Sequence, residues 1–170
     1  MNENDYIIEE RDAVVIRFAG DSGDGMQLTG TQFTNTSAVF GNDVSTMPDF
    51  PAEIRAPVGT TYGVSGFQIH FSSQDIHTPA YRPDVLIAFN PAALRGNAND
   101  VRPGGMIIIN IDAFNQKSLT RAGYTSDPLP ALRERYKLIE VPFTTLNRDA
   151  LQGLDRALAR ALKRIERVGA

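Results

Sequence analysis

The chain has 170 residues, of which 42% are apolar and 22% are charged, as in an ordinary folded domain. Its formal net charge of −3 provides no basic surface, which argues against a nucleic-acid partner. The chain contains no cysteine, which excludes disulfides, iron–sulfur ligation and thiolate zinc sites within it.

The N-terminal sequence MNENDYIIEERD is polar and lacks the charged start and apolar stretch of a signal peptide. No apolar run reaches the roughly 18 residues of a membrane span. We therefore expect a single domain over residues 1–170, located in the cytoplasm and without a membrane partner.

The first elements in chain order form a βα unit. Residues 13–18 read as a short buried strand, and the glycine turn FAGDSGDGMQLTG leads into a helix over 26–40 that ends at Gly41. Residues 43–47 fit a second strand. Three prolines then make 47–63 a long irregular segment, of the kind that is usually functional or disordered.

The remaining pattern repeats strand and helix. Residues 66–72 alternate apolar and polar side chains, which predicts a strand with one buried face and places His70 on the solvent side. Residues 84–89 and 106–110 are continuous apolar runs, as in strands covered on both faces. Between them, Asn90 and Pro91 mark a helix start. Residues 137–141 predict one more strand.

The last element is predicted to be an amphipathic helix over about 147–168 that packs on the sheet. Its apolar stripe consists of Leu151, Leu154, Leu158, Leu162 and Ile165. The alternation of strands and helices predicts an α/β fold, a single open and mostly parallel sheet with helices on both faces. In such a sheet ligands bind at the carboxyl ends of the strands, so residues 19–26, 47–62 and 90–97 should converge there.

The glycine turn is the first candidate site. Its spacing is G-x-x-G-x-G, which is neither the dinucleotide fingerprint nor a P-loop. Two aspartates in the turn would repel a bound phosphate, unless they cap the next helix or accept hydrogen bonds from loop amides. A tight connection without any ligand explains the same glycines. The candidate residues are Gly20, Asp21, Ser22, Gly23, Asp24, Gly25 and Met26.

The proline-rich segment is the second candidate site. One interpretation is a surface loop with solvated charges. The other is a docking surface, in which the prolines lower the entropic cost of presenting apolar side chains to a partner. The candidate interface residues are Phe50, Glu53, Ile54 and Arg55.

The sequence contains no clear pattern of catalytic residues or metal ligands. The aspartates have no matched carboxylate for acid–base work, and His70 and His77 have no third ligand nearby. Ser22 lies at a strand-to-helix turn, but the glycines around it break the G-x-S-x-G frame of a nucleophile elbow. We therefore expect no catalytic residue and no metal ligand in this chain.

Two long strings carry a family resemblance. FAGDSGDGMQLTGTQF, followed by DVSTMPDFPAEIRAPVGTTYGVSGFQIHFS, resembles the γ domain of 2-oxoacid:ferredoxin (acceptor) oxidoreductases, and RPDVLIAFN and PGGMIIIN continue the likeness. The likeness runs from about residue 13 to about 151. It is strongest to the 2-oxoglutarate enzymes in which γ is fused ahead of the α domain.

The resemblance implies a part of a larger enzyme. That enzyme converts a 2-oxoacid and coenzyme A into acyl-CoA, carbon dioxide and reduced ferredoxin, or runs the reverse carboxylation. The resemblance implies thiamine diphosphate and Mg²⁺ in the α and β parts, and iron–sulfur clusters in cysteine-bearing parts. The γ domain would contribute subunit contacts and the coenzyme A side of the site, which the turn 20–26 would face.

The tail departs from the family pattern, because residues 155–170 do not resemble the sequence that leads into the α domain. A separately encoded γ subunit, a shortened chain and an altered end all stay open. Two other functions also stay open: a stand-alone binding module that shares this fold without enzyme activity, and a small enzyme that uses Ser22 or the aspartates.

Overall fold

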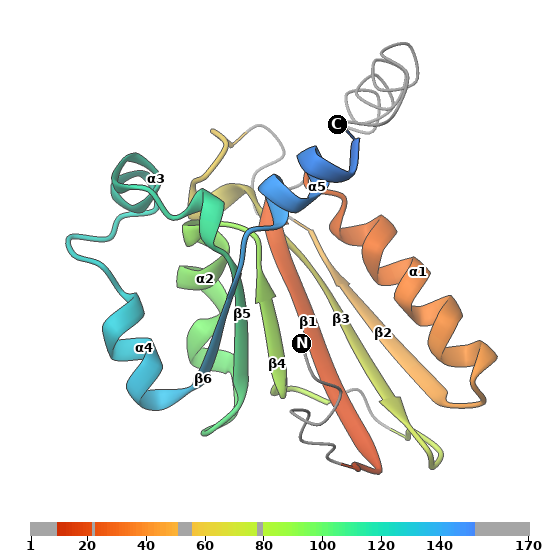
Figure 1. Cartoon of the computed structure of the whole chain (residues 1–170). Helices are drawn as coiled ribbons and strands as arrows, with labels where there is room; N and C mark the ends of the chain where they lie inside the picture. The colour runs from red at the N-terminus through yellow and green to blue at the C-terminus, as the bar shows by residue number, and fades with distance from the viewer. Residues whose placement is uncertain (1–9, 22, 51–55, 78–79, 152–170) are drawn as a thin grey trace, which may run out of the picture.

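The computed structural model describes residues 10–21, 23–50, 56–77 and 80–151. Within them, six strands form one sheet in the order β2-β3-β1-β4-β5-β6 (Figure 1). The strands are β1 (Ala13–Asp21), β2 (Asp43–Asp49), β3 (Val64–Ser72), β4 (Val85–Ala88), β5 (Met106–Asn110) and β6 (Lys137–Val141). β3 runs antiparallel to both its neighbours, whereas β1, β4, β5 and β6 are mutually parallel. The predicted mostly parallel sheet is confirmed.

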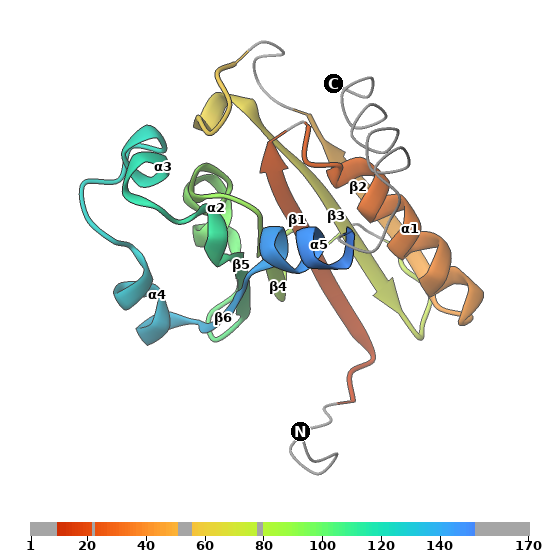
Figure 2. The same ribbon diagram turned by 45° about the horizontal axis from the view of Figure 1, so that its top comes forward.

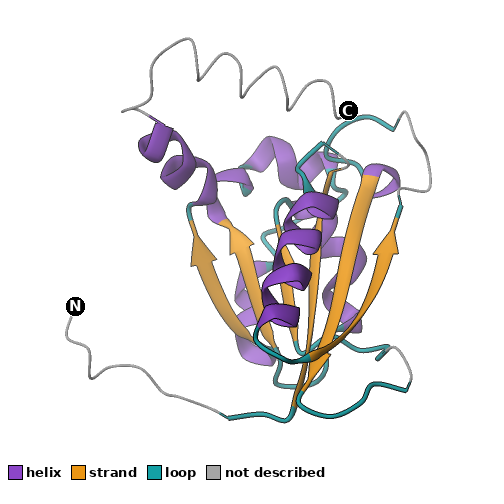
Figure 3. Cartoon of the chain, turned by 90° about the vertical axis from the view of Figure 1, so that its right-hand side faces the viewer, coloured by secondary structure: helices purple, strands orange, loops and turns teal. Residues whose placement is uncertain are grey.

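Helices cover both faces of the sheet, as predicted. They are α1 (Met26–Val39), α2 (Pro91–Asn97), α3 (Gln116–Arg121), α4 (Leu129–Arg135) and α5 (Phe143–Leu151). α1 packs over β1, β2 and β3, while α2 and α4 lie on the opposite face (Figures 1 and 3). Short 3₁₀ turns occupy Thr61–Gly63, Ala98–Asp100 and Ile111–Ala113.

The starts of α1 and α2 follow from local chemistry. Gly25 precedes α1 with φ 78°, a left-handed conformation that glycine adopts without steric cost. The side chain of Asn90 accepts a hydrogen bond from the Ala93 amide at 2.8 Å and caps α2, with Pro91 at its first position. Both predicted helix starts are confirmed.

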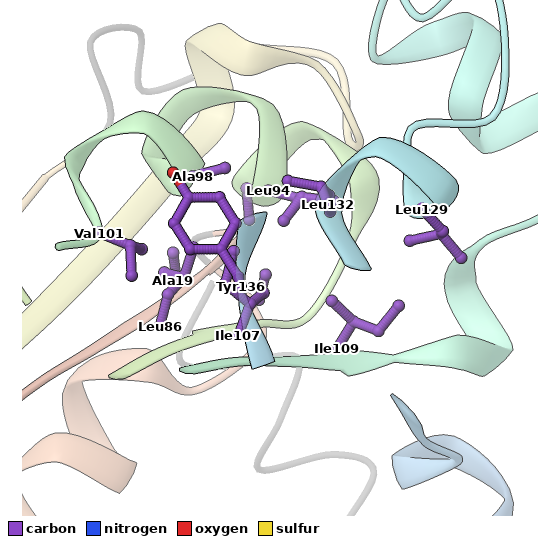
Figure 4. Packing of buried hydrophobic residues seen from close by; sticks show 12 residues of the cluster. Ala19, Leu86, Leu94, Ala98, Val101, Ile107, Ile109, Leu129, Leu132 and Tyr136 are labelled. Carbon is purple, nitrogen blue, oxygen red and sulfur yellow. The ribbon is translucent and has the colours of Figure 1, made fainter. Parts of the chain in front are cut away.

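The core divides into two layers, one on each side of the sheet. On the α2 side, Leu86, Ile107 and Ile109 are completely buried beneath α2 and α4 (Figure 4). On the α1 side, Phe18 and Phe67 form a smaller cluster with residues of α1. The ring of Phe33 in α1 lies 6.0 Å from that of Phe18.

The burial of β3 differs from the prediction. Gln68, expected on a solvent face, is only 3% exposed, and its side chain accepts a hydrogen bond from Arg17 at 2.9 Å. His70 is partly buried rather than solvent-facing. The reason is that β3 lies inside the sheet, and residues 80–81 pass over this face, where their carbonyls accept hydrogen bonds from Gln68 and Arg17.

The cover of β4 and β5 also differs from the prediction. Both strands are fully buried on the α2 side, but Ile87 and Ile108, which point to the α1 side, remain partly exposed. The described helices therefore bury only one face of these strands completely. The predicted C-terminal helix begins earlier than expected, at Phe143, and the part beyond Leu151 lies outside the described residues.

Candidate functional site at the carboxyl edge of the sheet

The carboxyl ends of the strands bring the predicted segments together. The Gly59 amide donates a hydrogen bond to Asp21 Oδ2 at 3.0 Å, and the Phe89 amide donates to the Ala19 carbonyl at 2.9 Å. The helix after β1 packs on one face and the helix after β4 on the other, so β1 and β4 flank a topological switch point. That is the position where open α/β sheets bind ligands.

The glycine turn is held by its own aspartates. Asp24 Oδ2 accepts a hydrogen bond from the Asp21 amide at 2.8 Å, and the Asp24 amide donates to the Asp21 carbonyl at 2.9 Å. A Cβ atom on Gly20 would lie 2.8 Å from Asp24 Oδ2, so glycine there leaves room for the carboxylate. Two roles were considered for the aspartates, capping the next helix or accepting hydrogen bonds from loop amides. Asp24 has the second role.

The other predicted residues of the turn differ in their surroundings. Gly25 needs its positive φ, whereas a Cβ on Gly23 would meet no atom within 4 Å. Met26 is 1% exposed and belongs to the α1-side core, and its Sδ and Cε atoms would lie 3.2 Å from a Cβ atom on Gly20. Ser22 lies outside the described residues.

The two carboxylates are electrostatically unfavourable in this position. Burial, followed by the charge of Asp24, raises the pKa of Asp21 above its usual 3.8. Hydrogen bonding by the Gly59 amide and the Asn90 side chain, and the charge of Arg121, partly offset this rise. The pKa of Asp24 is also raised by partial burial of its carboxylate, and its bond to the Asp21 amide works in the opposite direction.

Three buried polar atoms at this edge make no hydrogen bond of ordinary length and angle within the described residues, although the Asn90 side chain is close enough to the Asp21 carboxylate to lower its pKa. They are Asp21 Oδ1, Asn90 Nδ2 and Asn110 Oδ1, which follow or end the neighbouring strands β1, β4 and β5. Buried polar atoms without a partner are uncommon, and each one calls for an explanation. A ligand or partner group at this edge would provide one.

α5 lies above this edge (Figure 2). The ring of Phe143 stacks on that of Phe89 at a centroid distance of 5.4 Å. Asn110 Nδ2 donates to Thr144 Oγ1 at 3.1 Å, and the Thr145 amide donates to Asp112 Oδ2 at 2.7 Å. These contacts fix the first turn of α5, although none of its residues is buried.

The segment after β2 exposes apolar side chains. Phe50 is 70% exposed, and Val58 and Tyr62 of the same loop are 71% and 65% exposed. Glu53, Ile54 and Arg55 lie outside the described residues. The described part of the loop therefore has the apolar, exposed character that a docking surface requires.

Sequence reasoning missed several residues of this edge. Asn110 ends an apolar strand and could have been found, because a polar residue at the carboxyl end of a buried strand is a candidate site residue. Gly59 and Arg121 have no such local signal. Their approach to Asp21 depends on how the loop and α3 return to the edge.

The described residues contain no group of three or more histidine, aspartate or glutamate side chains that could hold a metal ion. Together with the absence of cysteine, this gives no set of ligands for Mg²⁺ or an iron–sulfur cluster in the described part. Among the same residues, no helix is long and apolar enough to cross a bilayer.

Comparison with known proteins identifies the family. The sequence model of the pyruvate ferredoxin/flavodoxin oxidoreductase family matches residues 15–162. The chain belongs to this family. Within it, the chain is 54% identical over 142 residues to the 2-oxoglutarate oxidoreductase subunit KorA of Mycobacterium tuberculosis, a match that covers 83% of this chain and 22% of KorA. The chain thus spans under a quarter of that relative's length.

Solved structures of the family share the fold. A 2-oxoglutarate:ferredoxin oxidoreductase from Magnetococcus marinus, solved with 2-oxoglutarate, coenzyme A and succinyl-CoA bound, superposes with a TM-score of 0.63 at 24% identity, covering 82% of this chain and 22% of that one. The γ subunit of a keto/oxoacid ferredoxin oxidoreductase from Geobacter sulfurreducens gives 0.54 at 17% identity, covering 78% and 62%. The resemblance to this oxidoreductase family is confirmed.

Proposed function

We propose that this chain is the γ component of a 2-oxoglutarate:ferredoxin oxidoreductase. The assembly would convert 2-oxoglutarate and coenzyme A into succinyl-CoA, carbon dioxide and reduced ferredoxin, or run the reverse carboxylation. The observation that carries the proposal is the 54% identity to a 2-oxoglutarate oxidoreductase subunit over 83% of the chain. An identity of this size over most of a domain supports the same role in a related assembly.

The proposed role of the chain is positioning rather than chemistry. In this proposal the α and β parts hold thiamine diphosphate and Mg²⁺, and cysteine-bearing parts hold the clusters that pass electrons to ferredoxin. The lack of cysteine and of a metal-ligand group among the described residues is compatible with that division. The assembly would work in the cytoplasm.

Two surfaces of the chain would take part. The turn from Gly20 to Met26 would border coenzyme A, because it lies at the switch point near the buried Asn110 Oδ1, which lacks a hydrogen-bond partner within the described residues. Since Asp21 and Asp24 would repel phosphates, the turn would face an uncharged part of coenzyme A. The loop with Phe50, Glu53, Ile54 and Arg55 would contact the α and β parts.

The coenzyme A proposal is tested by the backbone of the turn. Gly25→Val places a β-branched residue at φ 78°, at a cost of about 1–3 kcal/mol. In the assembled enzyme we expect the KM for coenzyme A to rise about tenfold or more, or turnover to be lost, while circular dichroism stays native.

The matched control is Gly41→Val, because Gly41 has the same left-handed backbone with φ 83° and no neighbour within 4 Å of a Cβ atom, but lies beyond the other end of α1. This variant should keep the KM of the parent enzyme. Unchanged coenzyme A kinetics in Gly25→Val would mean that the turn is only a connector between β1 and α1.

A further inference from the structure

On the face of the sheet that carries α1, strands β4, β5 and β6 present apolar side chains that the described residues leave partly exposed. β4 and β5 alternate strictly, with Leu86, Ile107 and Ile109 completely buried and the residues between them partly exposed. The strand register aligns the partly exposed side chains in rows: Ile87, Ile108 and Ile139 in one, and Val85 and Met106 in the next. We call these five residues the open face.

The composition of β4 and β5 indicates that the open face is covered in the folded protein. Parallel strands with apolar residues on both sides occur where both faces of the sheet are packed. In Figure 3, which looks onto this side of the sheet, α1 lies in front of the strands, and α5 lies above them. The position beside α1, over β4 and β5, therefore needs an occupant.

The space beside α1 has the width of one helix. Neighbouring strands are about 4.8 Å apart and packed helices about 8–10 Å apart. A helix placed next to α1, which packs over β1, β2 and β3, would thus lie over β4 and β5. The side of α1 toward this position is grooved: a hollow of about 520 Å³ is lined by Leu28, Phe33 and their neighbours, and Phe33 contacts Phe18 of β1.

α1 also lacks charge on this side. No aspartate, glutamate, lysine or arginine occurs from Gly25 to Asn42, although Leu28 is 66% exposed. Interface cores are depleted of charged residues in the same way. The groove and the open face therefore suit an apolar stripe rather than a charged surface.

We propose that the C-terminal segment 152–170 is the occupant, docking as an amphipathic helix on the open face beside α1. α5 brings the chain above this face, since Phe143 stacks on Phe89 of the same side, and α5 ends at Leu151. The stripe Leu154, Leu158, Leu162 and Ile165 follows within the next 14 residues. Residues 1–9 offer only Met1, Tyr6, Ile7 and Ile8, too few to cover two strands.

The spacing of the stripe matches the spacing of the rows. Four helical residues advance about 6.0 Å, and two strand residues about 6.6 Å. With Leu154 near α5, Leu158 would lie on the row of Ile87 and Ile108, and Leu162 on the row of Val85 and Met106. The basic residues of the tail, such as Arg160 and Lys163, would point to solvent. This proposal is independent of the proposed function.

Methionine oxidation by hydrogen peroxide tests the proposal in the full chain. Met106 is the probe on the open face, Met47 (39% exposed) is the exposed reference, and Met26 (1% exposed) reports unfolding. We expect Met106 to be oxidised about fivefold or more slowly than Met47, as measured by peptide mass spectrometry. Leu162→Asp should bring the two rates within about twofold, while the neighbouring opposite-face variant Lys163→Asp should not.

Other outcomes overturn the proposal. Equal oxidation of Met106 and Met47 in the unmodified chain would show an uncovered face. Protection of Met106 that survives Leu162→Asp would assign the cover to another polypeptide, and to a second copy of the chain if it depends on protein concentration.

A second measurement applies if Leu162→Asp also exposes Met26 and so unfolds the protein. Because the chain has no cysteine, an engineered pair forms any disulfide without competition. Ile108→Cys with Leu158→Cys should cross-link within one chain at least tenfold faster than Ile108→Cys with Arg160→Cys, since only the stripe residue would face the strand. Equal rates for the two pairs would contradict the docking.

Discussion

At the residue scale, Asp21 connects three parts of the carboxyl edge. Its amide donates to Asp24 Oδ2, its own Oδ2 accepts from the Gly59 amide, and the Asn90 side chain at the start of α2 lowers its pKa by hydrogen bonding. The structure retains this carboxylate even though its surroundings favour the neutral form. A group kept in an electrostatically costly state is a candidate for function, because such sites often trade stability for activity.

The variant Asp21→Asn tests whether the ionised Asp21 carboxylate lowers the stability of the fold. Since folding raises the pKa of Asp21, the ionised carboxylate lowers stability at pH 7, and stability is regained as the pH falls through the raised pKa toward 3.8. Asparagine retains an oxygen that can accept from the Gly59 amide. We therefore expect an equal or higher Tm at pH 7, and a difference from the parent that shrinks as the pH approaches 3.8.

Asp75→Asn is the control, because it removes the same charge from an exposed position. Scanning calorimetry at a series of pH values provides the measurement. A Tm for Asp21→Asn that lies well below the parent at pH 7 would mean that the charge itself stabilises the edge.

The candidate residues show what sequence can reveal at this scale. The glycine turn was identifiable because its glycines and aspartates are adjacent in the chain. The hydrogen bond of Asp21 with Gly59 and the effect of the Arg121 charge on its pKa were not identifiable, since they join residues far apart in sequence. Met26 was grouped with the turn by position alone, and its burial follows from the packing of α1.

At the element scale, the close approach of α1 to β3 depends on Gly30. A Cβ atom there would lie 2.1 Å from the ring of Phe67. Gly30→Ala should therefore lower the free energy of unfolding by about 1–3 kcal/mol, despite the better helix propensity of alanine. Urea denaturation of the pure chain measures this effect.

Gly96 in α2 is the matched control, because a Cβ atom there meets no atom within 4 Å. Gly96→Ala should leave stability unchanged or raise it by up to about 1 kcal/mol. If Gly30→Ala proved as stable as Gly96→Ala, the tight packing of α1 on Phe67 would be refuted.

Strands and helices with long apolar patterns were predicted correctly from the sequence, whereas short helices and the edge strand were more difficult to predict. β4, β5 and β6 and the starts of α1 and α2 follow from apolar runs and capping residues. The short helices α3 and α4 have too few turns to show a periodic pattern. β2 extends past the predicted end to Asp49 and includes Pro48, which an edge strand tolerates because one side needs no hydrogen bonds.

At the scale of the whole molecule, three exposed apolar side chains lie at the carboxyl edge of the sheet. Phe50, Val58 and Tyr62 extend from the same edge of the sheet as the glycine turn. A partner that covered this loop would also approach the switch point between β1 and β4. The proposed interface and the proposed coenzyme A site would therefore form together.

Whether this chain works as one part of a 2-oxoacid oxidoreductase can be measured by titration. The chain is added to its α and β partner parts while 2-oxoglutarate-dependent dye reduction is measured with and without coenzyme A. We predict no activity from the chain alone, saturable activation of the partners that requires coenzyme A, and a half-saturating concentration about tenfold higher for Phe50→Asp. Turnover by the chain alone, or partner activity that does not change when the chain is added, would show that the chain is not a γ component.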